Sequence, residues 1–285
     1  MDEGIEERRR QIQEQEERLR VRMSKVKHKV AVLSGKGGVG KSTVTVNLAV
    51  AFAMRGHIGK VGILDADIHG PSIPKMLGLT GQNLQAGPPG IFPASGPLGI
   101  KVVSIDFLLP DEDTPVIWRG PLKMAAIRQF LADIVWGELD LLLIDLPPGT
   151  GDEALSIGQL LPEMDGVIIV TIPSEVSQRV VRRAVVFARK LGMPVIGIIE
   201  NMSGFVCPNC GAKVDIFRSG GGRKIADELS IPFLASIPID QKICEDADRG
   251  MPFIIGHPDS PASKIFLEIV EKIENFLEHN NLKKS

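Results

Sequence analysis

The segment GKGGVGKS contains residue types at a spacing that suits the binding of phosphate groups. Glycines allow backbone N–H groups to turn towards an anion, and a helix that begins directly afterwards presents its positive end. Gly35, Gly40, Lys41 and Ser42 match the pattern G-x-x-x-x-G-K-[ST]. In this pattern the lysine contacts the β- and γ-phosphates and the hydroxyl ligates Mg²⁺. We therefore predict a P-loop here, although the pattern does not explain the second lysine that follows the first glycine.

Carboxylates follow two other apolar runs of the chain. Asp65 and Asp67 lie in LDADIHGPS, and Asp145 lies in LLLIDLPPGTGD. An α/β sheet places its ligand at the carboxyl ends of its strands, so we expect these side chains near the P-loop. One carboxylate there can hold Mg²⁺ directly or through water, and another can position the water that attacks a phosphoryl group.

Cys207 and Cys210 form a C-x-x-C pair in NMSGFVCPNCGAK, and Gly211 suits the tight knuckle found at zinc and iron sites. A tetrahedral zinc site or a [4Fe–4S] cluster needs four ligands. The third cysteine, Cys244, lies in a predicted helix and is expected to be buried as a small apolar residue. The pair is therefore half of a site, and a two-fold axis would supply the other half from a second copy of the chain.

A redox role is a weaker interpretation of the cysteine pair. A thioredoxin-like pair lies at a helix N-terminus after a strand. Here the next segment, GAKVDIF, has the composition of a strand. We therefore expect the pair to bind metal.

Short apolar runs and helical segments alternate along the chain. The runs are near-continuous in apolar residues, as in strands buried on both faces. Alternation of strands and helices predicts βαβ units, and thus an α/β, three-layer fold with a mostly parallel central sheet flanked by helices. The predicted strands are 29–34, 60–65, 100–105, 139–145, 166–172 and 194–200, and the helices between them are 42–56, 123–136 and 177–192.

We expect one main domain with a charged extension. Residues 1–27 are dominated by Glu, Arg, Gln and Lys and are predicted to form an exposed helical arm. Residues 28–285 would form a single domain with a metal-binding insertion around 201–218. The Gly/Pro-rich segment 81–98 is predicted to be a long surface loop, and 261–285 an amphipathic helix that packs on the domain.

Composition excludes several classes of protein. The chain has 285 residues, 44% of them hydrophobic, and a net charge of −2, which argues against a general nucleic-acid binder. We expect no membrane-spanning helix and no signal peptide, because the chain contains no long apolar run and its first residues are charged. Three cysteines are too few for a disulfide framework, so a reducing cytoplasm is the expected location.

The P-loop sequence GKGGVGKS resembles the deviant Walker A motif of the MinD/ParA/nitrogenase iron protein class of dimeric ATPases. The resemblance implies that Lys36 is the signature lysine, which reaches across a two-fold interface to phosphates bound by the other subunit. It implies that Asp67 is the switch I residue that orients water and that Asp145 is the switch II residue near Mg²⁺. Asn201 would contact the adenine edge, and Pro238 lies in SIPID, which resembles a second adenine-side segment.

These interpretations together predict three sets of site residues. The catalytic residues are Lys36, Lys41 and Asp67. The Mg²⁺ ligands are Ser42, Asp65 and Asp145. The nucleotide-binding residues are Gly35, Lys36, Gly37, Gly38, Val39, Gly40, Lys41, Ser42, Thr43, Asn201 and Pro238.

The chain from about residue 28 also resembles the Mrp/ApbC-type iron–sulfur cluster carrier ATPases. The motifs are VAVLSGKGGVGKST, LDADIHGPSIPKMLG, LLIDLPPGTGDEALS, IENMSGFVCPNCG and SIPFLASIPID. The resemblance implies a homodimer that binds ATP and hydrolyses it slowly. A labile [4Fe–4S] cluster would be held by Cys207 and Cys210 of both subunits and transferred to apo-proteins. No cysteine precedes Cys207 in this sequence, so we do not expect the second, N-terminal cluster of some eukaryotic relatives.

Two alternatives remain open at this point. In the first, the cysteine pairs hold a structural Zn²⁺ and the protein is a nucleotide-dependent dimer switch, since CPNCG also suits a zinc knuckle. In the second, the chain is a positioning ATPase of the MinD or ParA kind. Such proteins need a membrane helix or a basic DNA-binding surface, and neither is evident in this sequence.

Overall fold

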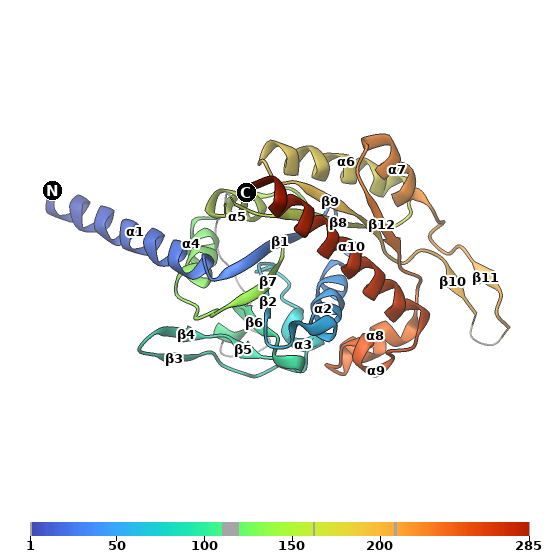
Figure 1. Ribbon diagram of the computed structural model, residues 1–285, viewed down its shortest axis with the longest axis horizontal. Coiled ribbons are helices and arrows are strands. Elements are labelled where there is room, and N and C mark those ends of the chain that lie inside the picture. The colour runs from blue at the N-terminus through green and yellow to red at the C-terminus, as the bar shows by residue number, and fades with distance from the viewer. Residues whose placement is uncertain (1, 110–119, 162, 208–209, 285) are drawn as a thin grey trace.

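A mostly parallel sheet forms the centre of the protein (Figure 1). The computed structural model describes residues 2–109, 120–161, 163–207 and 210–284. Within these residues, eight strands pair in the order β12-β9-β8-β1-β7-β2-β6-β5, and every neighbouring pair is parallel except β5 with β6. Their bounds are β1 Val26–Ser34, β2 Val61–Asp65, β5 Ala94–Ser95, β6 Lys101–Ser104, β7 Leu139–Asp145, β8 Gly166–Thr171, β9 Val195–Glu200 and β12 Phe233–Ser236.

Helices cover both faces of the sheet because successive strand residues point to opposite sides. In β1, Val30 and Val32 belong to one hydrophobic core, whereas Ala31 and Leu33 belong to the other. The first core is covered by α2 Lys41–Phe52, α3 Ile73–Met76, α8 Gln241–Asp248, α9 Phe253–Gly256 and α10 Pro261–Lys284. The second is covered by α4 Gly120–Ala132, α5 Asp152–Leu160, α6 Glu175–Lys190 and α7 Gly221–Leu229. This three-layer arrangement confirms the predicted fold class.

The six apolar runs predicted as strands correspond to β1, β2, β6, β7, β8 and β9, and the three predicted helices correspond to α2, α4 and α6. Buried runs of Val, Ile and Leu specify strands here because each strand is covered on both faces. Three short helical turns lie next to these elements. A π-helical turn, Ala53–His57, follows α2, and two 3₁₀ turns, Pro97–Gly99 and Ile105–Leu108, lie before and after β6.

The segment 81–98 differs from the predicted surface loop. It contains a two-stranded antiparallel hairpin, β3 Gln85–Gly87 with β4 Gly90–Phe92, followed by β5. The backbone of Ile91 forms two hydrogen bonds with the chain that follows α4. The Ile91 N–H donates to the backbone carbonyl of Asp133 at 3.0 Å, and the Ile91 carbonyl accepts from the Val135 N–H at 2.7 Å. These contacts join residues far apart in sequence, so local Gly/Pro composition could not indicate them.

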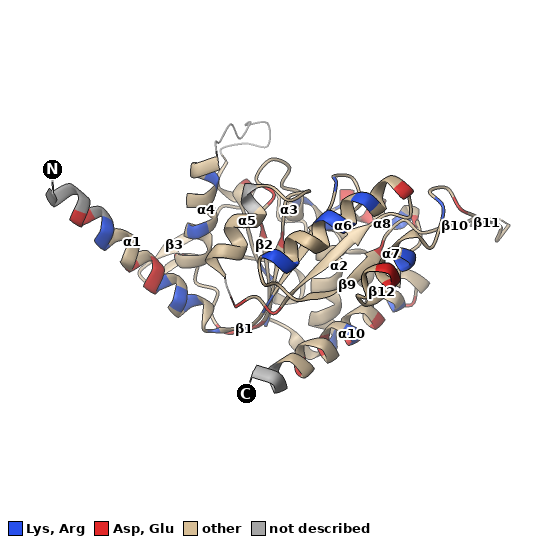
Figure 2. Ribbon diagram, turned by 90° about the horizontal axis from the view of Figure 1, so that it is seen from above, with Lys and Arg blue, Asp and Glu red and all other residues tan. Residues whose placement is uncertain are grey.

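The N-terminal helix α1 is Asp2–Met23 (Figure 1), and its described part carries Arg and Glu side chains (Figure 2). Its last turn is part of the domain rather than of an exposed arm, since Met23 is buried in the second core. Arg18 also forms an ion pair with Asp133 at 3.2 Å. Strand β1 begins at Val26, before the boundary expected after residue 27.

The C-terminal helix α10 packs on the domain, as predicted. Its apolar stripe lies against α2 and β12, with Phe266, Ile269, Val270 and Ile273 buried. No helix of the described residues has both the length and the apolar character that crossing a membrane requires.

The packing of α10 predicts the effect of a cavity in this stripe. Ile269→Ala should lower the free energy of unfolding by about 2–5 kcal/mol, because the side chain is 0% exposed and its removal leaves a void. Glu268→Ala, on the exposed face of the same helix, should change it by less than about 0.5 kcal/mol. Chemical denaturation measures both, and equal values for the two variants would show that the stripe is not packed.

Candidate functional site

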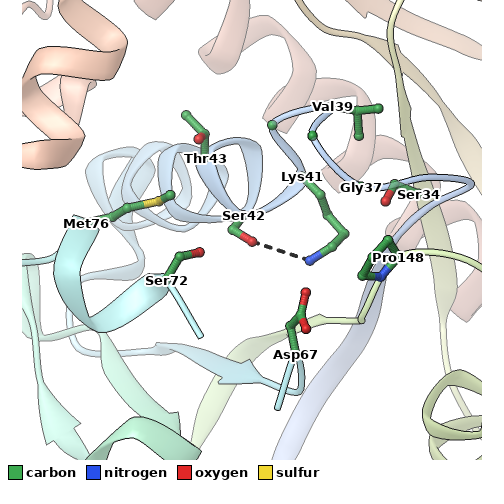
Figure 3. A pocket seen from close by; sticks show the side chains of 12 residues that line it. Ser34, Gly37, Val39, Lys41, Ser42, Thr43, Asp67, Ser72, Met76 and Pro148 are labelled. Carbon is green, nitrogen blue, oxygen red and sulfur yellow. Dashed lines mark hydrogen bonds between the residues drawn. The ribbon is translucent and has the colours of Figure 1, made fainter. Parts of the chain in front are cut away.

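The predicted P-loop joins the end of β1 to the start of α2, as the phosphate-binding interpretation requires. It borders a cavity of about 200 Å³, called here the P-loop hollow. The side chains of Lys41, Ser42 and Asp67 point into the same space (Figure 3). The residues that line the hollow are Ser34, Gly37, Gly38, Val39, Gly40, Lys41, Ser42, Thr43, Asp67, Ser72, Met76 and Pro148.

The buried carboxylate of Asp145 holds the first turn of α2. The Lys41 ammonium forms an ion pair with Asp145 Oδ2 at 2.5 Å, and the Ser42 hydroxyl donates to the same oxygen at 2.6 Å. Thr45 Oγ1 lies 2.6 Å from the other oxygen, Oδ1. Asp145 therefore brings the P-loop lysine and hydroxyl to one point at the end of β7.

Asp65 and Asp145 are direct partners in the register of β2 and β7, so their carboxylates lie side by side at the edge of the sheet. Both are 0% exposed. Burial, and next the negative charge of Asp145, raise the pKa of Asp65 to about 8. Its oxygens accept from the Ser104 hydroxyl at 3.1 Å and from the Asp67 N–H at 3.2 Å.

Asp67 has a different position from the other two aspartates. It lines the P-loop hollow and is partly exposed, whereas Asp65 and Asp145 are not among the lining residues. Burial raises the pKa of Asp67 above its ordinary value. A carboxylate on the wall of the hollow is well placed to accept a hydrogen bond from a water molecule there.

The oxygen atoms beside the P-loop suit Mg²⁺. Magnesium prefers hard oxygen ligands and is usually held by one or two carboxylates together with substrate phosphates and water. Ser42 Oγ and Asp145 Oδ2 lie 2.6 Å apart, and Asp65 is adjacent to Asp145. The donor set therefore fits the predicted cation, with Ser42 and Asp145 nearest the hollow.

Lys36 does not line the P-loop hollow, although it lies between two lining residues, Ser34 and Gly37, in the sequence. It is half-buried and is not one of the lining residues. No carboxylate of the described residues forms an ion pair with its ammonium group. The Lys36 backbone carbonyl accepts a hydrogen bond from Ser34 Oγ at 3.0 Å, which fixes the first turn of the loop.

Asn201 and Pro238 lie on two neighbouring segments beyond the ends of β9 and β12. The Asn201 side chain is buried and its amide donates to the Val39 carbonyl at 2.9 Å. Gly40 allows this approach: its φ is +77°, and a Cβ there would lie 2.3 Å from Asn201 Nδ2. The two segments are bonded through Ser203 N–H and the Ile237 carbonyl at 2.9 Å. Their expected contacts with adenine stay predictions.

Cys207 and Cys210 lie at the end of a β-hairpin that projects from the body of the protein (Figure 1). Strand β10 is Phe205–Val206 and strand β11 is Lys213–Val214. The Cys207 N–H donates to the Ala212 carbonyl, and the Gly211 N–H donates to the Cys207 carbonyl, both at 2.9 Å. Gly211 has a φ of +71°, so the knuckle needs glycine.

This hairpin brings together two cysteines, which is half the number of ligands that the predicted metal site requires. Cys207 is half-buried and Cys210 is exposed. No third His, Cys, Asp or Glu among the described residues joins them in a metal-binding group. The pair follows one strand and precedes another, so it does not have the helix N-terminus of a thioredoxin-like redox pair.

The expectation for Cys244 is wrong in one respect. It lies in helix α8, as predicted, but it is exposed rather than buried. Helix α8 turns Asp246 inwards and leaves Cys244 on its outer face. Helical periodicity decides which residues share a face, but the tertiary structure decides which face is covered.

Two buried polar residues at this end of the sheet were not predicted. Thr45, one turn into α2, bonds to Asp145, and its signal is its position four residues after the P-loop lysine. Glu200, the last residue of β9, is a buried carboxylate next to Asn201. A carboxylate at the end of an apolar run is the same signal that identified Asp65 and Asp145.

A larger cavity, of about 730 Å³, lies at the other end of β1 between α1, α4 and α5. It includes Leu19, Met23, Val26 and Lys29 in its lining and contains none of the predicted site residues. Size alone does not identify a site, and the smaller P-loop hollow combines the glycine loop, the lysine and the aspartate.

Comparison with known proteins identifies close relatives. The chain matches the family described as "ParA: NUBPL iron-transfer P-loop NTPase" over residues 25–274. It is 57% identical over 251 residues to the iron-sulfur cluster carrier protein of Saccharolobus solfataricus, covering 88% of this chain and 84% of that relative. It is 59% identical over 244 residues to the protein of that name from Methanocaldococcus jannaschii, covering 86% and 83%.

Solved structures of similar proteins agree with the fold. A nucleotide-binding protein from Archaeoglobus fulgidus, in complex with ADP and with cobalt, has a TM-score of 0.74 at 43% identity over 84% of this chain and 92% of that one. The cell division ATPase MinD of Pyrococcus furiosus has a TM-score of 0.63 at 23% identity, covering 88% and 99%, and supports the fold alone.

The raised pKa of Asp65 predicts a pH dependence of stability when nucleotide and Mg²⁺ are withheld. The unfolded chain loses this proton near pH 4, but the folded chain keeps it to about pH 8. The free energy of unfolding contributed by Asp65 is therefore complete below about pH 4 and is lost progressively as the pH rises to about 8. Asp65→Asn removes this titration, so the wild type should lose stability relative to the variant across that interval. Denaturation at several pH values with a chelator measures the difference, and parallel curves would contradict the prediction.

Proposed function

Because the chain belongs to the ParA/NUBPL family of iron-transfer P-loop NTPases, we propose that it is a homodimeric iron–sulfur cluster carrier that binds and slowly hydrolyses ATP. The observation that supports this most directly is the pairing of a P-loop with a projecting Cys207–Cys210 hairpin in one domain. The relatives carry the name iron-sulfur cluster carrier protein, and their similarity covers more than four-fifths of this chain.

The P-loop residues would bind and orient ATP. Backbone N–H groups of the loop face the phosphates, and Lys41 adds positive charge at the β- and γ-phosphates. Ser42 and Asp145 would hold Mg²⁺, and Asp65 lies next to Asp145. The cation would neutralise negative charge that develops on the γ-phosphate. Asp67, on the wall of the hollow, would hold the attacking water in line.

Lys36 would serve the nucleotide of the partner subunit. Its position outside the lining of its own hollow supports this role. A cation that arrives across a two-fold interface stabilises charge in the transition state and makes hydrolysis depend on the dimer.

The cysteine pairs of two subunits would hold one [4Fe–4S] cluster as cargo. Each hairpin supplies two thiolates, and a two-fold axis doubles them to the four that such a cluster requires. The exposed position of Cys210 would allow the cluster to pass to an apo-protein.

A zinc-bridged switch is the second candidate, since the glycine knuckle of the hairpin also suits Zn²⁺. The two candidates differ in the metal content of protein purified without oxygen and reconstituted with iron and sulfide. We expect about two irons and two sulfides per chain, which equals one [4Fe–4S] cluster per dimer. About half a zinc per chain, without a cluster, would favour the switch.

Cys207→Ala should abolish cluster binding and leave the ATP affinity of the metal-free protein unchanged, because the hairpin lies apart from the P-loop hollow. Cys244→Ala is the matched control: it removes an exposed cysteine from α8 and should keep the full cluster. Iron and sulfide analysis with visible absorption measures both. A full cluster in the Cys207 variant would show that the ligands are assigned wrongly.

Substitutions of the two P-loop lysines should have different effects on ATP binding and hydrolysis. Lys41→Ala should weaken ATP binding by about tenfold or more, since it removes a charge-assisted contact with the phosphates. Lys36→Ala should keep ATP affinity within about threefold and lose hydrolysis, because it removes a group that acts in the transition state. Calorimetry and phosphate release measure these quantities.

A mixture of the Lys36→Ala and Lys41→Ala proteins provides a further check. A mixed dimer contains one site with an intact P-loop and a Lys36 from the partner, so part of the hydrolysis should return. Equal loss of ATP affinity in the two single variants would contradict the proposed role of Lys36.

A further inference from the structure

A buried carboxylate lies between the nucleotide site and the cysteine hairpin. Glu200, at the end of β9, is 0% exposed. Its oxygens accept hydrogen bonds from four donors: the N–H groups of Gly220 and Gly222, and the hydroxyls of Ser203 and Ser236. No lysine or arginine of the described residues forms an ion pair with it, so these hydrogen bonds replace the water that burial removes.

Two of the donors belong to the start of helix α7. The Gly220 N–H lies 3.0 Å from Glu200 Oε1, and the Gly222 N–H donates to Oε2. The positive end of α7 therefore faces the carboxylate. A Cβ at Gly222 would lie 2.9 Å from the Glu200 Cβ, so glycine is required for this approach.

The two hydroxyls come from the base of the cysteine hairpin and from the strand beside it. Ser203, two residues before β10, donates at 2.5 Å, and Ser236, at the end of β12, donates at 3.4 Å. The backbone adds two more bonds at this base: Ser203 N–H to the Ile237 carbonyl and Ile239 N–H to the Gly204 carbonyl, both at 2.9 Å. Glu200 thus fixes the point where the hairpin leaves the sheet.

The next residue in sequence contacts the P-loop. Asn201 donates from its side chain to the Val39 carbonyl at 2.9 Å, and its own N–H donates to the Thr171 carbonyl at 2.7 Å. A change in the backbone at Val39 on phosphate binding would move Asn201, and Glu200 is attached directly to it. Two consecutive residues thus join the P-loop to the base of the hairpin.

We propose that Glu200 is a positioning residue that links nucleotide binding at the P-loop to the placement of the Cys207–Cys210 hairpin, so that nucleotide and metal change each other's affinity. The inference rests on the proposed function, because it requires that the protein bind both ligands. The hydrogen bonds hold Glu200, the start of α7 and the base of the hairpin together, because each bond offsets part of the cost of burying the carboxylate. Linkage then requires the two affinity changes to be equal.

The test uses the full-length protein, with MgADP and Co²⁺ as probes. Co²⁺ bound to thiolates is followed by its visible absorption, and MgADP binding by calorimetry. In the wild type, saturating MgADP should change the Co²⁺ dissociation constant by about fivefold or more, and Co²⁺ should change the MgADP constant by the same factor.

Ser203→Ala removes the bond between the hairpin base and Glu200 and keeps the contacts of Glu200 with α7. It should bring both factors close to one, and Ser203→Thr, which restores a hydroxyl, should recover them. Ser219→Ala is the matched control. It also removes a hydroxyl near the hairpin, but this hydroxyl donates to Asp215 and not to Glu200. It should keep the wild-type factors.

The possible outcomes distinguish a failure of the role of Glu200 from a failure of the proposed function. Factors of one in the wild type, or unchanged factors in Ser203→Ala, would overturn the role of Glu200 and leave the proposed function standing. If the wild type bound no metal at the cysteines or no nucleotide, the proposed function would fail first, and this inference with it. Glu200→Gln adds a second readout: its amide group faces N–H donors, so the variant should lose the coupling together with thermal stability.

Discussion

The buried carboxylate of Asp145 accepts contacts from Lys41, Ser42 and Thr45, and so attaches the first turn of α2 to the end of β7. A carboxylate without water is strongly unfavourable unless cations and donors surround it. The ammonium group and the two hydroxyls offset that cost. Because the P-loop lies between β1 and α2, the same contacts fix the shape of the loop.

Two more buried carboxylates lie at this edge of the sheet, and each is accommodated differently. Asp65, beside Asp145, keeps its proton to about pH 8 because burial and the neighbouring charge oppose ionisation. Glu200 accepts N–H groups from the start of α7 and two hydroxyls. The carboxyl ends of β2, β7 and β9 thus each carry a buried carboxyl group where a parallel sheet places its ligands.

Two features of the chain are incomplete on their own. Lys36 does not line the hollow beside it, and the hairpin presents two cysteines where a cluster needs four ligands. The proposed homodimer would complete both with one symmetry operation, since an isologous interface repeats each surface. ATP hydrolysis and cluster binding would then depend on the same assembly.

Local sequence determined the parts that depend on near neighbours: six core strands, three of the helices between them, the P-loop and the glycine of the cysteine knuckle. Buried strands and glycine turns are specified by a few adjacent residues, so their patterns are visible in the sequence. The tertiary structure alone decided the hairpin within 81–98, the exposure of Cys244 and the contacts of Thr45 and Glu200. Each depends on residues distant in the chain, because burial and hydrogen-bond partners are set by which surfaces the fold brings together.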